Sequence, residues 1–90
     1  VMIIDFDVHH GNGTQDTFWE DDTVFYFGSH QAFIFPGSGA ESEIGAGKGE
    51  GYTSNHPMMP DSGDEELLEI YKEALPKAMN SFKPDILLVS

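Results

Sequence analysis

The sequence predicts an α/β fold in which helices flank a parallel sheet, and two kinds of pattern lead to that class. Apolar runs at residues 1–7, 23–30 and 85–90 have the composition of buried strands. Residues 64–82 instead carry apolar side chains at helical spacing. Strands that alternate with helical crossovers in this order favour parallel pairing.

The first half of the chain is predicted to be a strand, a short helix and a second strand. The strand over 1–7 runs into a polar turn that contains Gly11 and Gly13, and a short helix is expected next. Thr14 is the predicted cap of this helix, and the acidic residues 20–22 end it. The second strand, over 23–30, is rich in Val, Phe and Tyr.

The second half is predicted to be a long loop, a helix and a last strand. Residues 31–60 show no periodicity and are rich in Gly, Pro and Ser, which indicates a functional loop. The helix over 64–82 is expected to kink or split at Pro76. Because apolar strands reach both ends of the chain, we expect residues 1–90 to be an internal fragment of one larger domain.

The composition limits the classes of function. The 90 residues contain 16 acidic and 4 basic side chains, and a net charge of −12 argues against direct nucleic-acid binding. Without cysteine, a metal would have to be held by carboxylate and imidazole, and a cytoplasmic location is expected. No apolar stretch approaches the roughly 20 residues that cross a bilayer, so no membrane association is expected.

The segment that carries chemistry is residues 5–13, DFDVHHGNG, at the carboxyl end of the first strand. Open α/β sheets place their ligands there. Strand alternation is expected to put Asp5, Asp7 and His9 on one face, where Asp7 and His9 can bind one cation. A carboxylate with an imidazole suits Zn²⁺, and two ligands leave room for a third, water and substrate.

A plainer interpretation is that the aspartates cap turns and the histidines are solvated. Two carboxylates and two imidazoles at residues 5–10, directly after a buried strand, favour the metal site over this alternative.

The run from Asp5 to Gln15 resembles the signature of the histone deacetylase family. It has the form typical of the class II branch and of the bacterial deacetylases and acetylpolyamine amidohydrolases. The similarity continues through Ser29-His30, residues 35–39 and 45–49, Asn55 and residues 84–90. It implies the arginase-deacetylase type of α/β fold. It also implies zinc-dependent removal of acetyl groups from acetyl-lysine in proteins or from acetylated polyamines.

The resemblance also implies roles for single residues. Asp7 and His9 take the places of two of the three zinc ligands, and Phe35 that of an aromatic residue beside the acyl-lysine tunnel. Asp5 and Asn12 stand where the family has the partners of its catalytic histidines.

A potassium ion is expected at Asp5 and Ser29, although Gly28 replaces a usual serine. The resemblance also implies a second site for a monovalent cation, formed by backbone carbonyls near Phe18, Asp21 and Val24.

Other parts of the family's site are expected outside these residues. They are the tandem histidines, the tyrosine and the third zinc ligand, so the isolated 90 residues are expected to be inactive.

Two other functions stay open: a non-catalytic relative that binds a metal or a partner, and an arginase-like metallohydrolase with another substrate. Arginases typically carry Asp-x-His-x-Asp, whereas Gly11 follows His9 by two residues here, which favours one metal and the deacetylase branch. The glycines at 45–49 lack the context of a nucleotide-binding loop. No catalytic role is expected for His30 or His56.

Overall fold

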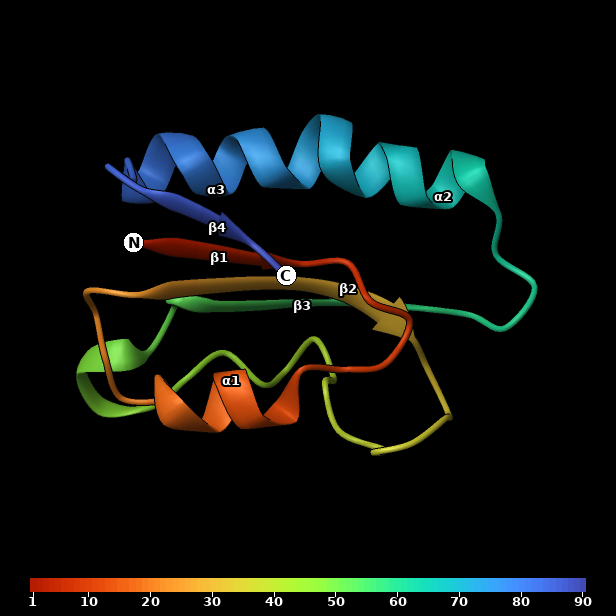
Figure 1. Cartoon of the computed structure of the whole chain (residues 1–90), viewed down its shortest axis with the longest axis horizontal. Helices are drawn as coiled ribbons and strands as arrows, with labels where there is room; N and C mark the ends of the chain where they lie inside the picture. The colour runs from red at the N-terminus through yellow and green to blue at the C-terminus, as the bar shows by residue number, and fades with distance from the viewer.

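The computed structural model describes residues 1–90, which form a parallel four-stranded sheet between two layers (Figure 1). The strands are β1 (Met2–Asp5), β2 (Phe25–Gln31), β3 (Thr53–Met58) and β4 (Leu87–Val89), and their order in the sheet is β3-β2-β1-β4. All three pairings are parallel. The predicted α/β class with a parallel sheet is therefore confirmed.

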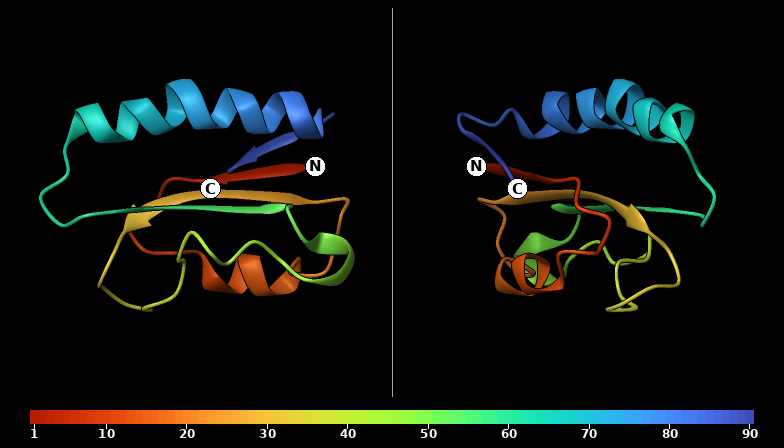
Figure 2. Two further views of the ribbon diagram at one scale, coloured as in Figure 1. Left: turned by 180° about the vertical axis from the view of Figure 1, so that it is seen from behind. Right: turned by 45° about the vertical axis from the view of Figure 1, so that its right-hand side comes forward.

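One face of the sheet is apolar and packs on the long helical segment. Met2 and Ile4 of β1 lie in register with Phe25 and Phe27 of β2, and these four buried side chains form the core. The helical segment consists of α2 (Asp64–Glu69), a π-helical turn (Ile70–Ala74) and α3 (Leu75–Phe82). Figures 1 and 2 show it as one rod along this face of the sheet.

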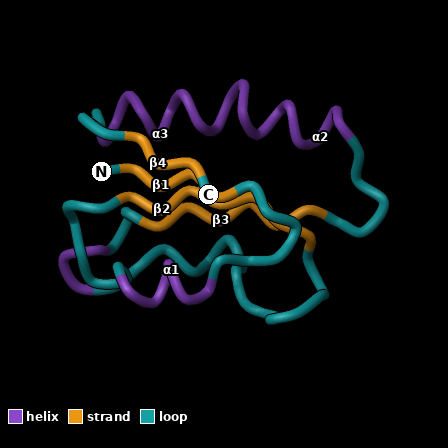
Figure 3. Tube along the Cα trace, in the orientation of Figure 1, coloured by secondary structure: helices purple, strands orange, loops and turns teal.

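The other face is covered by α1 (Asn12–Thr17) and by the long connection between β2 and β3. Figure 3 shows that this connection is mostly loop. A single 3₁₀ turn, Gly47–Gly49, is its only helical part. Because the strands are parallel, the segments that follow β1, β2 and β3 all leave from the same side of the sheet, at the carboxyl ends of the strands.

Pro76 lies where the α-helical pattern is split, as expected, but it does not end the helical segment. It is the second residue of α3, directly after the π-helical turn. The π-helical turn interrupts the α-helical hydrogen bonding just before this proline, and the rod continues past it (Figure 1). The predicted extent of 64–82 is correct.

The largest difference from prediction is β3, which lies inside the expected loop over 31–60. Its sequence is mostly polar, contains Pro57, and has only one of the β-branched and aromatic residues that mark strands, Thr53. The edge position explains why Pro57 is tolerated.

Two boundaries also differ from prediction. β1 ends at Asp5 rather than at residue 7. Thr14 lies inside α1, which begins after Gly11, so Thr14 is not its cap. None of the helices is long and apolar enough to span a membrane.

Candidate functional site

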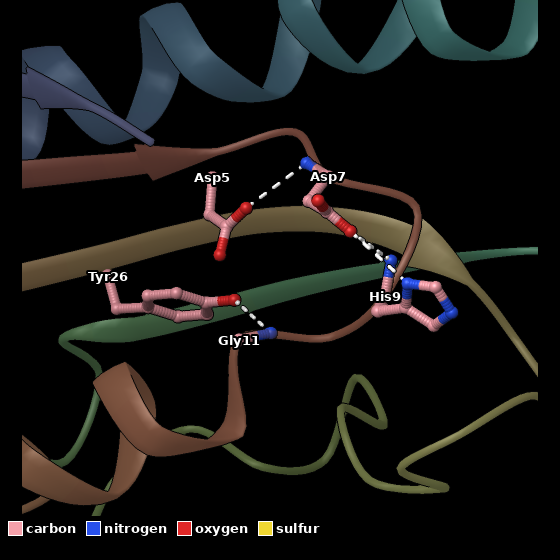
Figure 4. A network of polar contacts seen from close by, with 5 residues as sticks. All are labelled: Asp5, Asp7, His9, Gly11 and Tyr26. Atoms are coloured by element: carbon pink, nitrogen blue, oxygen red, sulfur yellow. Dashed lines mark hydrogen bonds and ion pairs between the residues drawn. The ribbon is translucent and has the colours of Figure 1, made fainter.

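The turn that follows β1 is built by two aspartates that accept hydrogen bonds from the backbone (Figure 4). Asp5, which is 8% exposed, accepts the N–H of Asp7 at 3.1 Å. Asp7 in turn accepts the N–H of His9 at 2.8 Å. Aspartate side chains favour turns of this kind, because they bind the backbone two residues on. These bonds replace strand pairing, so β1 stops at Asp5.

The side chains of Asp7 and His9 meet at the surface of this turn. His9 Nδ1 lies 3.4 Å from Asp7 Oδ1, and both side chains are more than half exposed. Strand alternation does not explain the meeting, since both residues lie beyond the end of β1. The hydrogen bond from the His9 backbone N–H is the main cause that holds the pKa of Asp7 below its usual value. Asp7 is therefore a carboxylate at neutral pH.

The spacing of these two atoms fits two ligands of a single metal ion. Two ligands about 2.0–2.2 Å from a tetrahedral ion are themselves about 3.3–3.6 Å apart. The 3.4 Å separation of His9 Nδ1 and Asp7 Oδ1 agrees with this spacing. No group of three His, Cys, Asp or Glu side chains in the chain could hold a metal. A complete site at this position would need a ligand from beyond these 90 residues.

Tyr26, on β2, also supports the turn and was not predicted as a site residue. Its hydroxyl accepts the N–H of Gly11 at 3.3 Å (Figure 4). Burial, with the charge of Asp5 as a second cause, raises the pKa of Tyr26 to about 12, so the phenol is neutral. The signal in the sequence was a tyrosine inside a buried strand, because such a residue needs a partner for its hydroxyl.

Gly11 and Gly28 make room for this arrangement. A Cβ on Gly11 would collide with the Asp5 carboxylate, and one on Gly28 would lie 2.8 Å from Cζ of Tyr26. The ring of Tyr26 therefore leaves no room for a side chain at Gly28.

Ser29 and Asp5 point to opposite faces of the sheet. Asp5 is paired with Gly28, so the side chain of the next residue, Ser29, points to the other face. There its hydroxyl lies 2.7 Å from the hydroxyl of Tyr71 on the helical segment. Ser29 could share a cation with Asp5 only through its backbone carbonyl.

The two remaining predicted site residues lie at the surface. Asn12 is the exposed first residue of α1, and its side chain forms no hydrogen bond within the chain. Phe35 is 81% exposed and precedes a cis peptide bond to Pro36. Its loop starts beside the turn that follows β1, since the Gln31 N–H donates to the Val8 carbonyl at 2.9 Å.

A buried polar cluster, also unforeseen, lies between the sheet and α1. The imidazoles of His10 and His30 are 5% and 3% exposed, with ring centroids 4.8 Å apart. His30 Nε2 lies 2.8 Å from the Gly39 carbonyl, and burial lowers the pKa of His30. Gln15, Glu43 and Asn55 extend this cluster. His56 lies elsewhere, with its ring tilted against that of Phe27 and the ring centroids 4.6 Å apart.

The comparisons with known proteins agree with one another. The family described as histone deacetylase domain matches residues 1–90. The chain is 50% identical over 90 residues to histone deacetylase 14, chloroplastic, from Arabidopsis thaliana. It is covered completely and spans 21% of that relative.

Solved structures give the same result for the fold. Acetylpolyamine aminohydrolase from Burkholderia pseudomallei superposes with a TM-score of 0.93 at 35% identity, over 99% of this chain and 27% of that one. A histone deacetylase homologue from Aquifex aeolicus gives 0.94 at 36% identity, over 98% of this chain and 24% of that one. The chain therefore spans only about a fifth to a quarter of these relatives.

Proposed function

The chain belongs to the histone deacetylase domain family, and from this premise we propose that it is part of a longer zinc-dependent deacetylase. The observation that carries the proposal is the pair formed by Asp7 and His9. Their donor atoms converge to 3.4 Å at the carboxyl end of β1, the edge at which α/β folds bind ligands.

The proposed reaction is hydrolysis of an acetamide. Water adds to the acetyl carbon, the carbon–nitrogen bond breaks, and acetate and a free amine are released. A zinc ion held at such a site polarises the carbonyl and makes water a stronger nucleophile. The carboxylate of Asp7 and a neutral His9 would be two of its ligands.

Residues beneath the turn support the proposed ligands through the backbone. Asp5 binds the N–H of Asp7, and Tyr26 binds the N–H of Gly11 (Figure 4). The turn is thus fixed on both sides of His9. Supporting contacts of this kind orient metal ligands and raise metal affinity.

A potassium ion beside Asp5 is a further part of the proposal. Asp5 is 8% exposed, and no basic side chain of the chain forms an ion pair with it. A nearly buried carboxylate without a countercharge favours a bound cation. The backbone carbonyls of Asp7, His9 and Ser29 would complete its oxygen ligands.

The proposed substrates are acetyl-lysine side chains of proteins or acetylated polyamines. Both become cationic amines on deacetylation, and a net charge of −12 favours cationic molecules near the surface. One related protein is named a histone deacetylase and another an acetylpolyamine aminohydrolase, which supports both classes. Phe35 would contact the acyl chain beside the metal.

The experiment that tests this function uses the full-length protein. Zinc content and hydrolysis of an acetyl-lysine peptide and of acetylated spermidine are measured for wild type, Asp7→Ala and His9→Ala. One zinc per chain in wild type, with activity lost in both variants, is the expected result. Asp22→Ala is the matched control, because Asp22 is exposed and its side chain forms no hydrogen bond.

Two other outcomes would change the proposal. Stoichiometric zinc without turnover on either substrate would favour a metal-binding relative without deacetylase activity. Absence of zinc from the wild-type protein would exclude the proposed site. The isolated 90 residues should bind zinc weakly and show no activity, since they lack the third ligand.

A further inference from the structure

The carboxylate of Glu43 holds the loop between β2 and β3 at two backbone positions. Glu43 Oε1 accepts the backbone N–H of Gly39 at 3.0 Å, and its Oε2 accepts that of Ala40 at 3.1 Å. Oε1 also accepts the side-chain amide of Gln15, on α1, at 2.8 Å. Burial raises the pKa of Glu43, but the hydrogen bonds from Gln15, Ala40 and Gly39 outweigh it and keep the pKa below its usual value.

Gln15 is itself fixed by groups from two other elements. Its Oε1 accepts the side-chain amide of Asn55, on β3, at 2.7 Å and lies 2.8 Å from His10 Nε2. A carbonyl oxygen has no proton to give, so His10 Nε2 is the donor. His10 Nδ1 then lies 2.7 Å from the Ser38 hydroxyl, which belongs to the same loop.

These contacts join the loop to the turn that carries Asp7 and His9. His10 directly follows His9, and the loop residues Ser38, Gly39 and Ala40 are tied to the same set of side chains. We call His10, Gln15, Ser38, Glu43 and Asn55 the loop anchor. Gln15 and Asn55 are 3% exposed and His10 is 5% exposed, so these three residues are largely out of contact with water, while Ser38 and Glu43 are half-buried.

The segment that the anchor holds presents two aromatic rings to solvent. Phe33 and Phe35 are each 81% exposed, and Phe33 has a φ of +65°. A bulky residue in the left-handed region is strained. Such a loop is kept in one shape at a cost, which indicates that its shape serves binding.

We propose that Glu43 and Gln15 are positioning residues for the substrate: they hold the loop so that Phe35 stands beside the metal site before the substrate arrives. The inference rests on the proposed function, in which Phe35 contacts the acyl chain. Neither residue touches the substrate. Their effect is to reduce the ordering that binding would otherwise require.

The first test replaces the carboxylate of Glu43 in the full-length protein. Glu43→Gln keeps the size of the side chain, but only one oxygen remains to accept three N–H donors. We expect KM for the acetyl-lysine peptide to rise about tenfold, with kcat within about twofold of wild type. Zinc content should not change. Glu41→Gln is the matched control, because Glu41 is exposed on the same loop and its side chain makes no hydrogen bond.

The second test exchanges the two polar groups. Gln15→Glu places two carboxylates against each other and should raise KM at least as much as Glu43→Gln. The double variant, Gln15→Glu with Glu43→Gln, restores a donor–acceptor pair between the two side chains and should recover part of the loss. A role in general folding alone would lower kcat, zinc content and stability together, and the double variant would show no recovery.

A readout that does not depend on activity separates this inference from the proposed function. Chymotrypsin cleaves after aromatic residues that no proline follows, so its rate of cleavage after Phe33 reports how firmly the loop is held. Cleavage should accelerate about tenfold in Glu43→Gln and stay unchanged in Glu41→Gln.

Unchanged cleavage and unchanged KM in Glu43→Gln would overturn the inference. A wild-type protein without zinc or activity would refute the proposed function and the substrate role with it, while the cleavage rates would still decide whether Glu43 holds the loop.

Discussion

The two faces of the sheet are buried by different means. Toward the helical segment, Met2, Ile4, Phe25 and Phe27 form an apolar core that excludes water. Toward α1, the buried residues include Asp5, Tyr26 and three members of the loop anchor, His10, Gln15 and Asn55, which are held by hydrogen bonds in specific directions. The first face stabilises the fold through the apolar area that it buries, and the second through hydrogen bonds of defined direction.

The difference shows where the proposed chemistry can be located. An apolar core tolerates exchange of one hydrophobic residue for another of similar volume. A hydrogen-bonded cluster fixes distances between named atoms and is therefore suited to positioning ligands. Asp7 and His9 lie at the end of β1, and the residues that hold their turn, Asp5 and Tyr26, point to the polar face.

The largest loss of stability should follow from a cavity on the apolar face. Phe27 is fully buried and contacts the rings of His56 and Tyr71. Phe27→Ala should lower the free energy of unfolding by about 3–5 kcal/mol, measured by urea titration of the full-length protein. Phe27→Leu, which keeps the site apolar, should cost clearly less. Equal losses in the two variants would contradict an apolar core that depends on volume.

On the polar face, the expected effect depends on shape. Gly28→Ala places a Cβ 2.8 Å from Cζ of Tyr26 and should cost about 1–3 kcal/mol of unfolding free energy. Combined with Tyr26→Leu, it should cost less than the sum of the two single changes, because the obstructing ring is gone. Gly13→Ala is the control: its Cβ would meet nothing within 4 Å in α1, so no loss is expected. Strict additivity of Gly28→Ala and Tyr26→Leu would show that the ring is not what requires Gly28.

The apolar face was predictable from the sequence, because apolar periodicity reports burial directly. The spacing from Leu67 to Phe82 gave the helical segment its correct extent. The strand composition of 23–30 located β2 to within two residues. These patterns depend on which side chains avoid water, and each can be found within one element.

The polar face was not predictable in the same way. Gln15, Glu43 and Asn55 come from a helix, a loop and an unforeseen strand, and each looks like a surface residue by itself. Only the fold brings them together. Asp7 and His9 were predicted as a pair from residue type and spacing. Their meeting, however, depends on the turn bonds of Asp5 and Asp7 rather than on the expected strand alternation.

A smaller loss is expected where hydrogen bonds rather than volume are removed. Asn55 donates to the Gln15 side chain and to the Glu43 carbonyl at 3.0 Å, while its own Oδ1 is buried without a partner. Asn55→Leu removes both bonds and also that unpaired oxygen, so the net cost should be about 1 kcal/mol in urea unfolding. A loss as large as that of Phe27→Ala would show that the polar face stabilises the fold as strongly as the apolar one.

The smallest expected effect is a loss of stability at acid pH, to which one histidine on each face contributes. His30 lies in the polar cluster and His56 against Phe27 on the other face, and burial lowers the pKa of each. A histidine whose pKa is lower in the folded state binds fewer protons there than in the unfolded chain. Its contribution to stability is complete above an ordinary histidine pKa of about 6.5 and is lost progressively as the pH falls below it.

The urea midpoint of the full-length protein, measured with EDTA, should therefore fall between pH 7.5 and pH 5.5. His56→Phe keeps an aromatic ring against Phe27 and should make this fall smaller, and His30→Gln should do the same on the polar face. If both variants fall as far as wild type, the acid sensitivity comes from other groups. If only His30→Gln reduces the fall of the urea midpoint, the apolar face does not exclude water from His56. The contrast between the two faces is then weaker than their burial indicates.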